Sequence, residues 1–289
     1  MTGASDLPFV PTEPALYEAS IIIPLFNRVD LTVACLRALA ANTGDVDHEI
    51  VLVDNASSDE TPELLAGLGG DVKVVRNEEN LGFATACNQG ARTASSERLV
   101  FLNNDTEPWP GWLPPLLGAL QDDDVVAAGS LLLFPDGTVQ HAGVVMVEND
   151  GEPPLLAMHH PYQVDPSHPL AQRARDVAVV TGASFVVDRQ AFFSVGGFDE
   201  GYWNGFEDVD LCLQLADAGG RIRYEPASVV THHESASGPE RFRRTDQNTA
   251  RLIERWHGRV TPDLLIDADD RTHVHPDGFL AAHHTPSAV

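Results

Sequence analysis

Three short stretches hold acidic and imidazole side chains whose types could do chemistry together. They are LVFLNNDTEP with Asp105, YWNGFEDVDLCLQL with Glu207 and Asp208, and THHES with His232 and His233. A carboxylate combined with an imidazole suits Mn²⁺ or Mg²⁺ when phosphate oxygens complete the ligand shell. Trp203 and Asn204 come just before the paired acids, and an aromatic ring beside carboxylates suits a sugar, which has an apolar face and many hydroxyls.

Each stretch also has an ordinary structural interpretation. Asn103, Asn104 and Asp105 could form a turn, because Asn and Asp hydrogen-bond their own backbone. Acids at the start of a helix are favoured by the helix dipole, and a histidine that ends a strand often lies on the surface. These alternatives stay open when each stretch is taken alone.

The elements that must position these residues alternate along the chain. The sequence predicts strands at 20–24, 49–53, 72–75 and 98–102 and helices at 30–42, 58–68 and 82–94, the last of the three following Asn80 and Leu81. Near-continuous apolar strands separated by amphipathic helices indicate a parallel sheet covered on both faces. After Trp112 we expect helices at 113–120, 208–218 and 246–257 and strands at 125–134, 177–187, 221–224 and 228–231.

Three segments have no clean periodicity. Residues 1–18 form a Pro-rich lead, residues 148–175 are rich in Pro and His, and apolar content falls after Gly258. We expect the middle segment to be a long loop or insertion. The tail at 259–289 is expected to be loosely ordered.

Polar clusters follow all four of the first strands. In an open parallel sheet, ligands bind beyond the carboxyl ends of the strands, so the clusters at 24–28, 54–59, 77–82 and 103–105 should meet in one crevice. The first cluster, PLFNR, has no glycine, which argues against a dinucleotide fingerprint and a nucleotidyltransferase loop. The only lysine, Lys73, is not part of a P-loop motif.

The composition of the chain limits the classes of molecule that the protein is expected to bind. With 18 basic and 43 acidic residues the formal net charge is −25, which argues against nucleic acid as the main partner. A nucleotide ligand remains compatible, because a metal ion and a few amides can hold a diphosphate. The three isolated cysteines favour reduced thiols and a cytoplasmic protein. The first twenty residues lack a basic start, and no apolar run is long enough to predict a membrane span.

Taken in order, the motifs resemble the inverting family 2 glycosyltransferases of the GT-A fold, and in particular a bacterial rhamnosyltransferase-like branch. The matching pieces are IIIPLFNR, EIVLVDNASSDET, VVRNEENLGFATACNQGA, LVFLNNDTEP, FPDGTVQHAGVV, GGFDEGYWNGFEDVDLCLQLADAGGRI and VVTHHESASG. The resemblance implies a Rossmann-like, mostly parallel sheet flanked by helices, with a smaller mixed region on the acceptor side. It implies one domain at 19–258, with a nucleotide-binding half at 19–110 and an acceptor-side half at 111–258.

The resemblance also implies roles for individual residues. The donor nucleotide would be bound by Pro24, Phe26, Arg28, Asp54, Asn80, Gly82, Phe83, Asn88, Asn103 and Asn104. Asp105 matches the last acid of the family's Asp-X-Asp metal motif, whose first acid is Asn103 here. His232 matches the late metal ligand, with His233 as the less favoured register. Asp208 would be the general base, and Glu207, Trp203 and Asn204 would face the acceptor or the transferred sugar.

The implied function is a metal-dependent inverting hexosyltransferase. It would use Mn²⁺ or Mg²⁺ to move a sugar from a UDP- or dTDP-sugar to a hydroxyl of a glycan or of a small-molecule or natural-product acceptor. A non-catalytic nucleotide-sugar or glycan-binding module on the same fold is the alternative. Since Asn103 replaces one acid, we expect weak metal affinity until the diphosphate binds. The sugar, the acceptor and the oligomeric state are left open.

Overall fold

The computed structural model describes residues 17–233 and 243–281 of the 289-residue chain. Its strands are β1 (Ala19–Leu25), β2 (His48–Asp54), β3 (Val72–Arg76), β4 (Arg98–Leu102), β5 (Thr106–Pro108), β6 (Val125–Leu133), β7 (Val139–His141), β8 (Val144–Asn149), β9 (Leu155–His159), β10 (Arg175–Asp176), β11 (Ser184–Asp188), β12 (Arg221–His232), β13 (Leu264–Ile266) and β14 (Thr272–Val274). Its helices are α1 (Val29–Asn42), α2 (Thr61–Ala66), α3 (Phe83–Thr93), α4 (Leu113–Ala119), α5 (Arg189–Ser194), α6 (Glu207–Asp217) and α7 (Thr245–Trp256).

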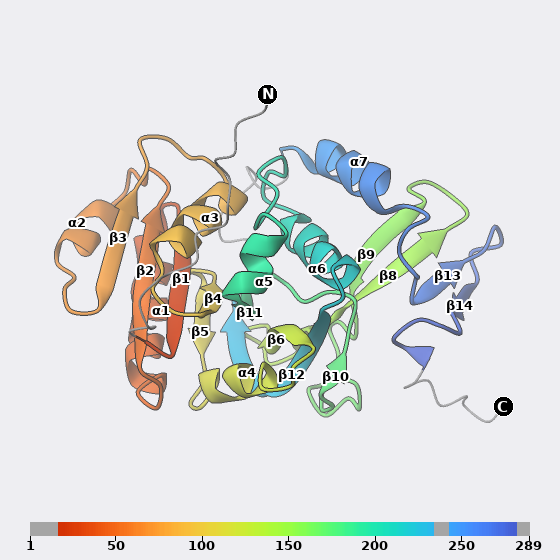
Figure 1. The fold of residues 1–289 in the computed structure, drawn as a ribbon, viewed down its shortest axis with the longest axis horizontal. Coiled ribbons are helices and arrows are strands. Elements are labelled where there is room, and N and C mark those ends of the chain that lie inside the picture. Colours follow the sequence, from red (N-terminus) through yellow and green to blue (C-terminus); the bar gives the residue numbers. More distant parts are fainter. Residues whose placement is uncertain (1–16, 234–242, 282–289) are drawn as a thin grey trace.

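A ten-stranded sheet runs through the described residues in the order β10-β12-β6-β11-β4-β1-β2-β3, with β5 added to β12 and β7 to β6. The first four strands pair in parallel, as their apolar sequences predict. Strand β11 is antiparallel to both of its neighbours, β4 and β6, whereas β12 is parallel to β6. The sheet is therefore mixed but mostly parallel, and the predicted fold class is confirmed (Figure 1).

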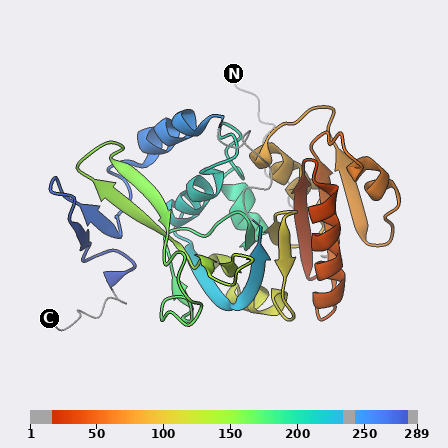
Figure 2. The ribbon, with the colours of Figure 1, turned by 180° about the vertical axis from the view of Figure 1, so that it is seen from behind.

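Helices cover both faces of the parallel half. Alternate residues of β1 point to opposite faces, so Ile21 and Ile23 pack with Cys35 of α1 while Ile22 packs with the α3 side. A methyl group added to Gly90 of α3 would lie 2.3 Å from Ile22 Cγ2, and glycine at this position allows the helix to sit close to the sheet. Seen from behind, α1 and β1 lie side by side, with β3 and α2 beyond them at the edge of the sheet (Figure 2).

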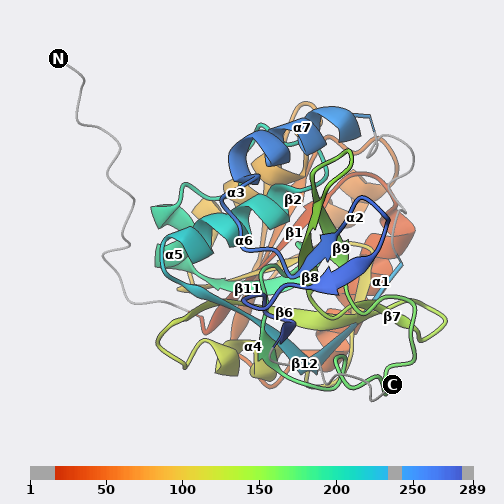
Figure 3. The ribbon, with the colours of Figure 1, turned by 90° about the vertical axis from the view of Figure 1, so that its right-hand side faces the viewer.

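A second sheet of four strands, β14-β13-β8-β9, corrects two predictions. The segment 148–175 is not one long loop, because it contains β9, which pairs with β8. The described part of the tail contains β13, which pairs with β8, and β14. Val147 and Leu280 pack in this sheet's own apolar cluster, and Asp263 accepts hydrogen bonds from the backbone N–H groups of Met146 and Leu280. Figure 3 shows these strands facing the viewer.

Several other helices and strands begin or end at residues that differ from the predicted ones. Helix α2 starts at Thr61 rather than at 58, because the Ser58 N–H donates to Asn27 Oδ1 and Asp59 Oδ1 accepts from the Thr61 N–H. The strand predicted at 177–187 begins only at Ser184. The two strands predicted at 221–231 form one strand, β12, with an irregularity between residues 225 and 229. Helix α5 was not predicted, although Asp188 caps it by accepting from the Ala191 N–H.

The predicted lead lies almost entirely outside the described residues. Within 17–233 and 243–281, no helix combines the length and apolar character required to cross a bilayer.

Candidate active site

The half of the site predicted to bind the nucleotide begins with a buried carboxylate at the end of β2. Asp54 is fully buried, and its Oδ1 accepts a hydrogen bond from the Ser57 N–H at 2.9 Å. Its Oδ2 has no hydrogen-bond partner and lies 3.5 Å from Arg76 Nε. A buried acceptor without a donor is costly, so a ligand N–H or O–H at this point would be favourable. Pro24 and Phe26, at the neighbouring end of β1, are half-buried.

Arg28 lies on the rim of the same edge. It adopts a left-handed backbone conformation before α1, and its guanidinium hydrogen-bonds Asp30. That hydrogen bond raises the pKa of Arg28, and the negative charge of Asp105 adds to the effect.

Side-chain amides fix the loop that leads into α3. Asn55 Nδ2 donates to the Gly82 carbonyl at 3.0 Å, and Asn55 Oδ1 accepts from Asn77 Nδ2 at 2.8 Å. Asn80 Oδ1 accepts from the Gly82 N–H, so Asn80 caps the loop locally. Gly82 has φ of 85°, and a Cβ there would lie 3.1 Å from the Trp203 ring. This glycine therefore permits both the turn and the close approach of the indole.

The loop with Trp203 and Asn204 joins the two halves of the site. Asn204 Oδ1 accepts from the Phe83 N–H at 3.0 Å, although the two residues are 121 positions apart. Asn248 of α7 holds the same loop from the other side, because Trp203 N–H donates to its Oδ1 and its Nδ2 donates to the carbonyls of Trp203 and Gly205. The Arg244 guanidinium lies 5.0 Å from the Trp203 ring.

Asp105 and His232 meet through a strand pairing that the sequence did not predict. Strand β5, directly after Asp105, pairs antiparallel with the end of β12, placing Thr106 opposite His232. His232 Nε2 lies 3.1 Å from Asp105 Oδ1, and both side chains are about one-tenth exposed or less. Burial acts to raise the pKa of Asp105, but the hydrogen bond and charge of His232 outweigh it, so the pKa is lowered. The carboxylate is thereby kept ionised.

The donor atoms at this point fit a divalent cation. A buried carboxylate and an imidazole face each other, and Asn103 Nδ2 lies 3.5 Å from His232 Nε2. Asn103 Oδ1 is buried without a hydrogen-bond partner, and this oxygen could serve as a third ligand for Mn²⁺ or Mg²⁺. Across the described ranges, no cluster of three or more His, Cys, Asp and Glu side chains could hold a metal ion. Ligand oxygens from a substrate would therefore have to complete the shell.

Asp208, at the start of α6, is bound to the segment that precedes β11. Its Oδ2 accepts a hydrogen bond from the Gly182 N–H at 2.7 Å. A Cβ placed on Gly182 would lie 3.4 Å from both the Asp208 Cβ and the Phe83 ring, so both side chains lie close to Gly182. Next to Gly182, the Ala183 carbonyl accepts from the Asn103 N–H at 3.0 Å. These contacts link Asp208 through Gly182 and Ala183 to the backbone of Asn103, two residues before Asp105.

The neighbouring acids have different surroundings. Glu207 is buried and accepts from the Gly205 N–H, so it stabilises the turn before α6. Asp210 is fully buried and is bound by Trp256 Nε1 at 2.7 Å and Arg255 at 3.0 Å. Burial raises the pKa of Asp210, against the effect of these two donors. Of the three acids, Asp208 alone is partly exposed.

Residues 20–192 match the family described as Glycosyl transferase family 2. The chain belongs to this family. O-antigen biosynthesis protein RfbC of Myxococcus xanthus is 37% identical over 227 residues, covering 76% of this chain and 18% of that protein. Pre-mycofactocin glycosyltransferase of Mycobacterium tuberculosis is 30% identical over 228 residues, covering 78% of this chain and 44% of that protein. The chain thus spans less than half the length of these relatives.

Solved structures agree on the GT-A fold expected for family 2. The structure of GalNAc-T7 with UDP, GalNAc and Mn²⁺ superposes with a TM-score of 0.61 at 20% identity, covering 84% of this chain and 49% of that one. Mannosyltransferase PcManGT of Pyrobaculum calidifontis, solved with GDP-Man and Mn²⁺, gives a TM-score of 0.59 at 20% identity, covering 87% and 68%. The family and the fold implied by the sequence motifs are both confirmed.

Three residues predicted for the family 2 site make other contacts. His233 Nε2 lies 2.6 Å from Glu107 Oε1, so His232 and not His233 faces Asp105. Asn104 Nδ2 donates to Thr32 of α1 at 3.0 Å. Asn88 is buried and uses its amide on the Phe198 backbone and on the Glu200 side chain. Local sequence could not reveal these contacts, because each partner is distant along the chain or on another element.

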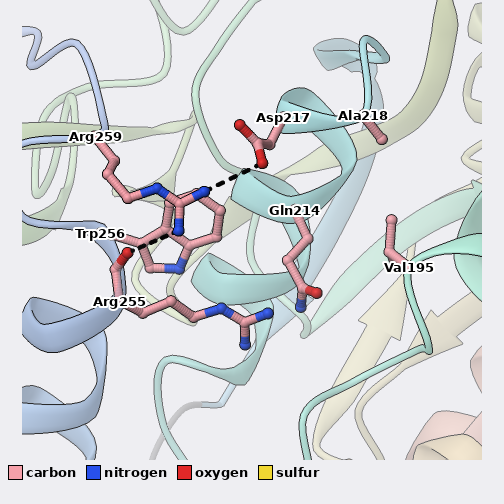
Figure 4. A pocket seen from close by; sticks show the side chains of 7 residues that line it. All are labelled: Val195, Gln214, Asp217, Ala218, Arg255, Trp256 and Arg259. Atoms are coloured by element: carbon pink, nitrogen blue, oxygen red, sulfur yellow. Dashed lines mark hydrogen bonds and ion pairs between the residues drawn. The ribbon is translucent and has the colours of Figure 1, made fainter.

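A separate hollow of about 260 Å³ lies between α6 and α7, away from the family 2 site residues. Arg259 at its edge donates to Asp217 and to the Arg255 carbonyl, and its guanidinium lies 4.8 Å from the Trp256 ring (Figure 4). Because these side chains bind one another, we interpret the hollow as part of the packing between α6 and α7.

Proposed function

We propose that this chain is a metal-dependent inverting glycosyltransferase that moves a sugar from a nucleoside-diphosphate sugar to an acceptor hydroxyl. The main support is the distribution of unsatisfied polar atoms. Five buried side-chain polar atoms in the described residues lack a hydrogen-bond partner, and three of them belong to the predicted site residues Asp54, Asn103 and Trp203. Because such atoms are rare in folded proteins, their concentration here favours a ligand that supplies the missing partners.

Asp105, His232 and the Asn103 amide would hold Mn²⁺ or Mg²⁺ in this proposal. Bound there, the metal would neutralise charge developing on the departing diphosphate. The family motif, the proximity of the two buried ligands and the Mn²⁺ in the two similar solved structures support this assignment. We infer a UDP- or dTDP-sugar as the donor, with Asp54 accepting a hydrogen bond from the nucleotide.

Asp208 would be the general base. Its partly exposed carboxylate would take the proton of the acceptor hydroxyl as that oxygen attacks the anomeric carbon, and the bond to the diphosphate would break in the same displacement. A single displacement inverts the anomeric centre and needs no enzyme nucleophile. Cysteine is unsuited to such a role here, since burial raises the pKa of the Cys35 and Cys212 thiols to about 12. Trp203 and Asn204 would line the acceptor or the transferred sugar.

The acceptor would be a glycan or a small natural product with a free hydroxyl. A cytoplasmic location stays a prediction from the isolated cysteines. The alternative, a non-catalytic binding module, is disfavoured because both Asp105 and Asp208 are present and lie at the site.

Incubation with UDP- and dTDP-sugars and Mn²⁺ tests the proposal. We expect slow, metal-dependent donor hydrolysis with at least one sugar, and loss of that hydrolysis in Asp105→Ala. Nucleotide binding without any transfer or hydrolysis would instead support the binding module.

A further inference from the structure

Gln140 is a buried side chain that contacts the proposed metal ligand His232 and that the function described above does not use. It lies at the centre of β7 and is 3% exposed. Its Oε1 is 2.7 Å from His232 Nδ1, and its Nε2 donates to the His232 carbonyl at 3.4 Å. One amide therefore contacts both the ring and the backbone of the same residue.

The β6–β7 hairpin explains how Gln140 reaches its position. The residues Pro135, Asp136 and Gly137 form the turn, and Asp136 Oδ1 accepts from the Thr138 N–H. Strand β7 then pairs with the end of β6, which pairs on its other side with β12 and so with the approach to His232. The pairing is irregular at Gln140, and the next residue, His141, has its Nδ1 2.9 Å from His159 Nδ1. Figure 3 labels β6, β7 and β12 in one region.

The two contacts of Gln140 determine which ring nitrogen of His232 carries a proton. A backbone carbonyl can only accept, so the amide NH₂ must face the His232 carbonyl. This leaves Oε1 facing Nδ1, and an amide oxygen can also only accept, so Nδ1 must be the donor. Nδ1 is thus committed to Gln140, and Nε2, which lies 3.1 Å from Asp105 Oδ1, is the nitrogen that would bind a metal ion.

We propose that Gln140 is a positioning residue, which fixes the tautomer and ring orientation of His232 so that Nε2 is presented as a metal ligand. The inference rests on the proposed metal role of Asp105 and His232. Histidines that bind metals usually donate their other N–H to a fixed acceptor, and loss of that acceptor typically weakens metal affinity 10–100-fold. Here the hydrogen-bond acceptor is the neutral amide of Gln140, which is itself oriented by its hydrogen bond to the His232 carbonyl.

The test is a titration with Mn²⁺, followed by electron paramagnetic resonance, of the full chain in saturating UDP. Gln140→Leu keeps the size of the side chain but removes the acceptor, and we expect it to weaken Mn²⁺ binding by about 10–100-fold. Gln140→Glu restores an acceptor oxygen and should stay within a few fold of the wild type. The control is Gln121→Leu, the same substitution at an exposed glutamine outside the site, which should bind Mn²⁺ as the wild type does.

Equal Mn²⁺ affinity of Gln140→Leu and the wild type would overturn the inference, as would equal losses in the Leu and Glu variants. If the wild type with UDP bound no Mn²⁺, the proposed function would fail together with this inference. If Gln140→Leu does not fold, nitrogen-15 correlation spectra of the wild-type histidines decide the question. With Mg²⁺ and UDP bound, we expect the His232 ring to carry its proton on Nδ1, and an Nδ1 without a proton would contradict the assignment.

Discussion

The two halves of the site differ in how far along the chain their contacts extend. On the nucleotide side, Asp54 and the loop to Gly82 follow directly after β2 and β3, and amides from the same half hold them. On the acceptor side, His232 is oriented by Gln140, which is 92 positions away, and the Trp203 loop by Asn248, which is 45 positions away. These contacts within the first half span at most 27 positions, whereas the second half depends on side-chain pairs of longer range.

This difference implies that substitutions on the acceptor side should affect catalysis or metal binding not only at Asp208 but also through residues that never touch the substrate. On the nucleotide side, effects should instead come from residues that contact the nucleotide directly. The predictions that follow run from the largest expected effect to the smallest.

Asp208→Asn should have the largest effect. An asparagine can keep a hydrogen bond at this position but cannot accept the proton, so we expect kcat to fall by about 10²–10⁴-fold. Binding of UDP with Mn²⁺, measured by calorimetry, should stay close to that of the wild type. A parallel loss of binding and turnover would mean that Asp208 is a metal ligand or a structural residue.

Asn248→Ala tests whether a side chain distant along the chain supports the Trp203 loop on the acceptor side. Removing this amide leaves the Trp203 N–H and two loop carbonyls without their partner, which costs about 1–3 kcal/mol for each group that stays unsatisfied. We expect a lower melting temperature and an acceptor KM raised by about tenfold, with a smaller change in UDP affinity. Gln247→Ala, an exposed change on the same helix, is the control. Equal effects on acceptor KM and UDP affinity would show that the halves are not separable.

His233→Ala and Asn104→Ala should have the smallest effects. Their side chains bind Glu107 and Thr32, and neither faces the Asp105 and His232 pair. We expect activity within about threefold of the wild type and stability changes near 0.5 kcal/mol. A large loss of Mn²⁺ affinity in His233→Ala would reverse the assignment of the histidine ligand.

The same contrast explains what the sequence could and could not predict. Strands β1 to β4 and the polar residues at their ends were predictable, because burial on both faces and the strand-to-turn change both leave local patterns. The pairing of β5 with β12 was not, since β5 is three residues long and its partner is over one hundred positions away. Pro- and His-rich composition hid β9, whose stability comes from pairing with β8.

Site residues followed the same rule. Asp105, His232 and Asp208 could be proposed because their types and order match a family motif. Gln140 and Asn248 were missed as supports, because a buried amide has no sequence signal until its partner is known. The contacts of Asn88 and Asn104 could not be separated from ligand contacts for the same reason.

The central claim is that a diphosphate completes a metal site of which the chain supplies only a part. Titration of the wild type and of Asp105→Ala with Mn²⁺, with and without UDP, tests it most directly. The account predicts weak Mn²⁺ binding by the wild type alone, binding at least about tenfold tighter with UDP, and loss of that gain in Asp105→Ala. Tight Mn²⁺ binding by the nucleotide-free protein, abolished by Asp105→Ala, would contradict it.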